Sequence, residues 1–218
     1  SDATKGWLPV SDDAVADVPV VPVTQKGLFA FGTDRSSNLN TRNLVNSSGV
    51  IAADASGAGT ARAQVAATSY GTDKAIFRGG RTSGAVGMSN LVSNSGVVAS
   101  DVSVVGTARN GPSGTTYGSS GQAAIVYGLA SSYTNIKNLI SSSGVVASDA
   151  SGVGTVRTVA GSTNYGGDKG IVGYGQTTSE TPISLSNLIS NTGVVAADVS
   201  GVGTARESIA AAGYSLSA

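Results

Sequence analysis

Four near-copies of one segment follow one another along the chain, and this repetition constrains the fold more than any other feature of the sequence. The first copy reads NLVNSSGVIAADASGAGTAR from Asn43, and the others start at Asn90, Asn138 and Asn187, which gives spacings of 47, 48 and 49 residues. The Arg that ends each copy is followed eight positions later by Tyr. All length variation falls between this Tyr and the next Asn-Leu. The pattern predicts a rigid scaffold of four units, each with one adjustable loop.

Each unit contains four runs that are typical of β-strands. A small-residue run ends in Tyr, as in ARAQVAATSY, and is followed by an apolar run such as KAIFRGG. The third run is NLV or NLI, and the fourth is GVVASD or a close variant. Glycines 49, 96, 144 and 193 stand between the last two runs, where they supply the positive φ of a tight hairpin. No long run with a period of 3.6 residues appears, so we expect an all-β protein.

The order of these runs favours a β-propeller with four blades of about 48 residues each. The second run is apolar on both faces, as a sheet between two neighbours requires. The small residues of the first run suit the innermost strand of a blade. The chain enters at a second run, 26–32, and finishes after a first run, 206–214, so pairing of these N- and C-terminal strands closes the ring. A β-solenoid, or units packed across several copies of the chain, is an open alternative.

Composition and charge exclude several classes of function. The chain has 13 Lys+Arg against 13 Asp+Glu and lacks Cys and His. Nucleic acids and anionic membranes attract proteins with a basic excess, so we expect neither as a partner. Without Cys and His there is no disulfide, usual zinc site or Ser-His-Asp relay. No apolar run approaches the roughly 20 residues of a membrane span. We expect a soluble protein that is not an enzyme and has no cofactor or metal.

Asp and Arg recur at fixed places in all four units and are the strongest chemical candidates. The Asp could be a calcium ligand or a glycosidase carboxylate, or it could be a turn former that pairs with Arg at each unit junction. A glycosidase needs two carboxylates in different environments, whereas the repeat supplies four alike. We therefore interpret these residues as a structural ladder: Asp54, Asp101, Asp149, Asp198, Arg62, Arg109, Arg157 and Arg206.

The variable loops carry the signal for binding. They are polar, rich in hydroxyl groups and different in each unit, and loops on one side of a rigid scaffold commonly bind ligands. A solvated rim without a ligand is the alternative. The expected contacts to a ligand or receptor, such as a host-surface glycan, are Arg35, Asn38, Arg81, Tyr133, Asn135 and Glu180.

The first 23 residues contain no repeat element and form a separate segment. They hold the only Trp, in Trp7-Leu8-Pro9, together with three of the five Pro residues. Because Pro favours extended structure, we expect residues 1–23 to form a docking arm that packs on another copy or on a larger assembly. A leader along the surface of the same chain is the alternative. The propeller then occupies residues 24–218.

The unit from Arg157 to Gly175 resembles kelch-type repeats, and so does the unit from Arg62 to Gly80, read from ARAQVAATSYGTDKAIFRGG. It is still more similar to a repeat of tailed-bacteriophage structural proteins, in which Tyr-Gly-x-Asp-Lys-Ala-Ile-Phe-Gly precedes Asn-Leu-Val-Ser-Asn-x-Gly-Val-Val. The resemblance covers residues 24–218. Paired glycines, as in kelch, end the apolar run only at Gly79-Gly80, and the later kelch Trp is missing.

The phage resemblance implies a virion component of the tail, fibre or capsid surface, which displays the propeller and contacts the host surface. It further implies that the arm binds other virion proteins and that the chain is a homo-oligomer in the particle. The expected location is the virion, on its outer surface or tail, and otherwise the extracellular space. A carbohydrate-binding adhesin or lectin that uses the variable loops is the alternative function.

Overall fold

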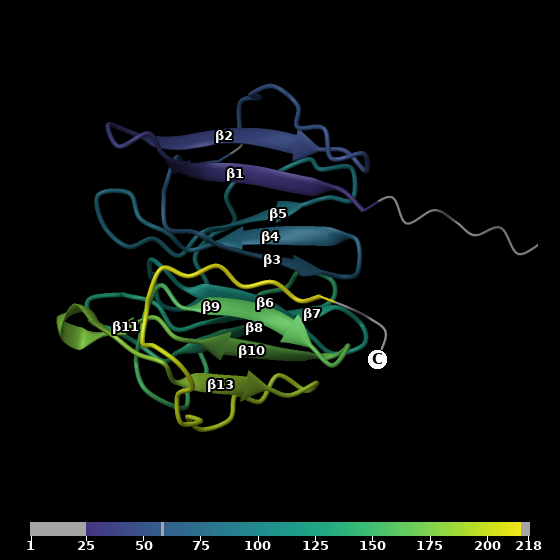
Figure 1. Ribbon diagram of the computed structural model, residues 1–218. Coiled ribbons are helices and arrows are strands. Elements are labelled where there is room, and N and C mark those ends of the chain that lie inside the picture. The colour runs from purple at the N-terminus through teal and green to yellow at the C-terminus, as the bar shows by residue number, and fades with distance from the viewer. Residues whose placement is uncertain (1–24, 58, 215–218) are drawn as a thin grey trace, which may run out of the picture.

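The computed structural model describes residues 25–57 and 59–214, and they form an all-β structure of small antiparallel sheets (Figure 1). The predicted docking arm, residues 1–23 with Trp7, Leu8 and Pro9, lies outside these residues. The one helical element within the described ranges is the short 3-10 turn η2 (Thr178–Glu180), so no helix there is long enough to cross a membrane.

The four repeats form four sheets, as the sequence predicts. In the first unit β1 (Gly27–Thr33) pairs with β2 (Asn38–Val45). In each later unit the middle strand pairs with both of the others. These strands are β3 (Ala66–Tyr70), β4 (Lys74–Arg78) and β5 (Ser89–Val92); β6 (Ser113–Tyr117), β7 (Gln122–Val126) and β8 (Lys137–Ile140); and β9 (Gly161–Tyr165), β10 (Lys169–Gly173) and β13 (Ser186–Ile189). A separate small hairpin, β11 (Gln176–Thr177) with β12 (Thr181–Pro182), lies in the loop of the last unit.

The fourth run of each unit does not form the continuous strand that the sequence predicts. In the second unit it makes only two isolated bridges, Val92 with Val98 and Ser89 with Val102. Ser89 and Val92 are three residues apart, whereas their partners Val102 and Val98 are four residues apart. The second strand therefore has one extra residue between the bridges, as in a β-bulge. The side chain of Asn90 bonds to the carbonyl oxygen of Ala99 within this interruption.

The sheets stack face to face because the middle strand of each unit is apolar on both sides. Ile76 packs toward the third unit, against Ile125 and Ile140, while Phe77 packs toward the first unit, against Ala30 and its neighbours. A third cluster joins the last two units. The core is therefore a series of three layers between successive sheets.

The stack has two ends. Figure 1 shows β2 and β13 at opposite ends of the molecule, with the second and third units between them. Backbone hydrogen bonds link successive units. The N–H of Gly111 donates to the carbonyl oxygen of Gln64, the N–H of Val159 donates to the carbonyl oxygen of Gly111, and the N–H of Ser208 donates to the carbonyl oxygen of Val159.

The strand pairing that would close a four-bladed ring is not formed among the described residues. There β1 pairs with β2 alone. The C-terminal segment 208–214 lies beside β9 instead, so that a Cβ added to Gly161 would come within 2.7 Å of Ile209. The closed propeller stays a prediction.

Candidate functional site: the unit junction and its uncovered halves

Arg62 and Thr60 lie in the segment between the sheets of the first and second units, and this segment is counted here with the first unit. Arg62 is the centre of the junction between these two units. Its guanidinium stacks on the ring of Phe31 in its own unit, with Cζ 4.0 Å from the ring centroid. On the side of the next unit, Nη2 donates to Oδ1 of Asn90, and Nη1 lies 3.6 Å from Oδ1 of Asp101. The side chain is fully buried, and this burial lowers the pKa of Arg62. One side chain thus joins an aromatic ring, an amide and a carboxylate from two units.

Asp101 completes the junction by accepting hydrogen bonds from the preceding unit. The backbone N–H and the hydroxyl of Thr60 both donate to its Oδ2, at 2.9 and 2.7 Å. The Asn90 amide donates to its other oxygen. Burial alone would raise the pKa of Asp101, but these hydrogen bonds and the charge of Arg62 outweigh it and hold the pKa below its usual value.

The same set of contacts recurs at the next two junctions. In each, Arg and Thr come from one unit, and Asn and Asp come from the unit that follows it. Each Asp is therefore joined to the Arg of the preceding unit rather than to the Arg eight residues later in the sequence. The sets are Arg109, Thr107, Asn138 and Asp149, and Arg157, Thr155, Asn187 and Asp198.

The middle junction differs in one respect. Gly79 stands where the first unit has Phe31, and the buried Arg78 lies near Arg109 and bonds to the carbonyl oxygen of Gly87. Burial, together with the charge of Arg78, lowers the pKa of Arg109 to about 10. Both guanidinium groups donate to Oδ1 of Asn138, and Nη1 of Arg109 lies 3.8 Å from Oδ1 of Asp149.

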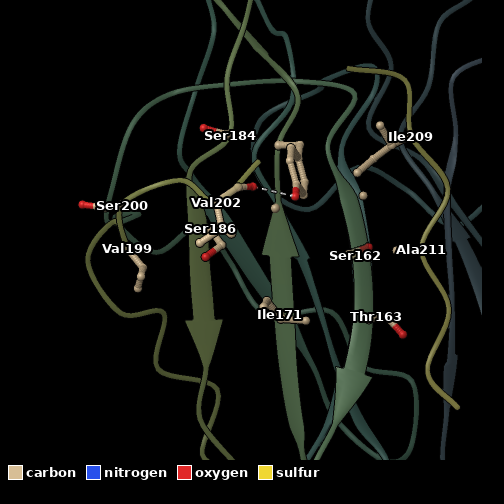
Figure 2. Close-up of a pocket in the computed structure, with 13 residues that line it drawn as sticks. Ser162, Thr163, Ile171, Ser184, Ser186, Val199, Ser200, Val202, Ile209 and Ala211 are labelled. Atoms are coloured by element: carbon tan, nitrogen blue, oxygen red, sulfur yellow. Dashed lines mark hydrogen bonds between the residues drawn. The ribbon is translucent and has the colours of Figure 1, made fainter. Parts of the chain in front are cut away.

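One half of a junction is uncovered at the C-terminal end of the stack. Arg206 stacks on Tyr174, with Cζ 4.1 Å from the ring centroid, but the Arg206 side chain is exposed. Among the described residues its guanidinium bonds only to the carbonyl oxygen of Thr204. The adjacent face forms a pocket of about 270 Å³ whose lining includes Ile171 and Gly173 (Figure 2).

Two segments frame this pocket on either side of β9 and β10. One contains Val199 and Val202, and the other contains Ile209 and Ala211 (Figure 2). The hydroxyl of Tyr174 donates to the carbonyl oxygen of Val202 and fixes the rim. At the previous junction the corresponding face is filled, because Val172, Ile189 and Val195 of the last unit pack there.

The matching half is uncovered at the N-terminal end. Asn43 and Asp54 hydrogen-bond to each other at 2.8 Å, as their counterparts do at the other junctions, but no Arg from the described residues reaches them. Phe29 is 61% exposed and Ile51 57%, whereas their counterparts Phe77 and Val98 are each 6% exposed. The first and last units therefore present the two halves of one interface.

The predicted contact residues of the variable loops lie along one edge of the stack. Figure 1 shows β11 and the loop between β1 and β2 at the same edge. Two hydrogen bonds link neighbouring loops, from the Asn38 amide to the carbonyl oxygen of Arg81 and from the Tyr133 hydroxyl to the side-chain oxygen of Gln176. Arg35, Arg81 and Glu180 are exposed on this edge.

Asn135 has a structural contact within its unit. Its side-chain amide donates to the carbonyl oxygen of Gly154 at 2.9 Å, as Asn40 does to Gly59 in the first unit. The edge thus combines residues that hold the loops together with charged side chains that face solvent.

The sequence analysis missed the Asn and Thr members of the junction. Both recur in all four units, as the Asn of Asn-Leu and the Thr two residues before Arg. The Asn and the Thr are the same residue in all four copies, whereas the loop residues differ between copies. They could have been found by asking which polar residues repeat without substitution.

No family model matches the chain, and no curated protein matches it either. The likeness to kelch-type and phage repeats therefore stays a prediction from motifs.

Proposed function

We propose that the protein is a structural component, a rigid stack of β units that serves as a spacer or displayed element in a larger particle. The observation that carries this proposal is the use of the recurring charged residues. At three junctions, Arg, Asp, Asn and Thr are bonded to one another across the boundary between units. Such networks add rigidity and fix the register of neighbouring units.

The motif resemblance supports a tailed-bacteriophage virion as the particle. In this proposal residues 1–23 bind other virion proteins, and the chain lies on the outer surface or tail. Mass spectrometry of purified particles tests it. We expect the chain at a fixed ratio to the major capsid protein, and its presence only in the soluble fraction of a lysate would overturn the proposal. Particles assembled with a chain that lacks residues 1–23 should omit it.

The second candidate function is carbohydrate binding by the loop edge. The exposed Arg35 and Arg81 on adjoining loops, together with the exposed Glu180 on the loop of the last unit, favour it, because charged and polar side chains fix the orientation of a polar ligand. Labelled protein, with and without residues 1–23, would be applied to bacterial cells and a glycan panel. Saturable binding that survives the truncation but is lost in Arg81→Ala would support a receptor site. No binding by either form would exclude it for that panel.

The four-bladed propeller is the finer form of the fold that the sequence predicts. It requires segment 208–214 to reach the free edge of β1 within one chain. Segment 208–214 of one chain could also pair with β1 of another chain. A disulfide between the first and last units distinguishes the two arrangements, because it forms within one chain in a closed ring and between chains in an assembly.

A further inference from the structure

We propose that copies of this chain associate head to tail, with the C-terminal end face of one copy seated on the N-terminal end face of the next. The occupant of each uncovered face is a second copy. The argument is continuity with an established interface, since each face is half of the junction that occurs three times inside the chain. The proposal does not depend on the phage assignment.

The apolar parts of the two faces match in position. At the internal junctions, one unit contributes residues such as Val172 and Ile189, which pack into the face of the preceding unit. The same register positions in the first unit are held by Phe29 and Val45, because Phe29 pairs with Asn43 as Val172 pairs with Asn187. In a second copy these side chains fill the pocket beside Ile171.

The two faces also match in size. At the first junction the large Phe77 packs against the small Ala30 of the preceding unit. Phe29 has the same bulk as Phe77, and Gly173 holds the place of Ala30 on the C-terminal face. A large side chain thus meets a small one again, as close packing requires.

The polar parts complete each other as well. Arg206 and Thr204 on one face correspond to Arg62 and Thr60. Asn43 and Asp54 on the other face correspond to Asn90 and Asp101, which bond to that Arg and Thr. In head-to-tail contact, the guanidinium of Arg206 donates to the amide oxygen of Asn43 in the next copy. The hydroxyl of Thr204 likewise donates to the carboxylate of Asp54.

The backbone gains a partner in the same contact. The later units have three strands, whereas no strand within residues 25–57 and 59–214 pairs with the edge of β1 that corresponds to the position of their small-residue strand. Segment 208–214 lies beside β9 in the place of such a strand, and no described strand pairs with it. Contact between copies brings this segment to β1 and completes the three-stranded sheet, which is β-strand addition.

Paired cysteines test the proposal cleanly, because the natural chain has none. The variant carries Asp54→Cys and Thr204→Cys, which are both exposed, so folding should be unaffected. Their internal counterparts, Thr155 and Asp198, are joined at 2.7 Å between Oγ1 and Oδ2. Thr155→Cys with Asp198→Cys is the matched control, which should form a disulfide within each chain.

Oxidised samples would be separated on non-reducing gels at several protein concentrations. We expect a ladder of dimers, trimers and larger species for the test pair, increasing with concentration, and only monomers for the control. A test-pair disulfide confined to monomers would overturn the proposal and show a ring closed within one chain. No disulfide in the test pair, with the control fully oxidised, would also overturn it.

Discussion

The guanidinium of Arg62 lies over the ring of Phe31, with Cζ 4.0 Å from the ring centroid, while its Nη2 donates to Asn90 of the next unit. The stacking holds the planar group in one orientation, and the orientation aims its donors across the boundary. Repetition of this arrangement gives the stack a single junction chemistry.

Removing the amide at an internal junction should destabilise the protein strongly. Asn138 is fully buried, accepts a bond from Arg109 and donates to Asp149. In Asn138→Ala the buried guanidinium loses this partner, and we expect the free energy of unfolding in urea to fall by about 3 kcal/mol. Asn43→Ala is the matched control on the uncovered face and should cost less than about 1 kcal/mol. Equal losses in the two variants would refute the assignment.

Acid should weaken the junctions. The pKa values of Asp101, Asp149 and Asp198 are lowered in the folded protein. Between these values and the unfolded value of about 3.9, the unfolded chain binds more protons. The stability from these carboxylates is therefore present above about pH 4 and is lost as the pH falls through the folded values. Urea titrations from pH 7 to pH 3 should show this loss, with a smaller change for Asp149→Asn, and identical pH profiles would contradict the prediction.

Alanine substitutions at two turn glycines, Gly144 and Gly49, distinguish the effect of backbone strain on stability from the effect of packing. Gly144 and Gly49 have nearly equal φ angles, 86° and 79°, so alanine pays a similar strain at both. A Cβ at Gly144 would lie 2.8 Å from the Tyr70 ring, whereas Gly49 has no atom within 4 Å. We expect Gly144→Ala to lower the melting temperature more, at an extra cost of about 1–2 kcal/mol. Dilute samples keep the comparison free of association, and equal melting temperatures would mean that the Tyr70 ring moves aside freely.

Most of the strands could be predicted because the same pattern of residues occurs in each of the four units. Three of the four runs that end in Tyr became β3, β6 and β9, whereas the predicted strand at 206–214 is not formed. The apolar runs became β1 and the middle strands β4, β7 and β10. The partner of each Asp could not be predicted. Asp101 and Arg109 are eight residues apart in sequence, yet the structure joins Asp101 to Arg62, across a boundary whose geometry depends on the stacking of whole sheets. The bulge after Val98 was missed for a similar reason, since a one-residue mismatch leaves the residue pattern unchanged.

The mass of the protein in solution, measured by light scattering over a range of concentrations, tests the central claim most directly. We predict a mass that rises above the 21.3 kDa of one chain as the concentration increases. Phe29→Asp should restore the mass of one chain by placing a charge in the contact. Val50→Asp should leave association unchanged, because Val50 and its counterparts Val97, Val145 and Val194 are all exposed, at internal junctions as well. A constant mass of one chain at every concentration would contradict the account.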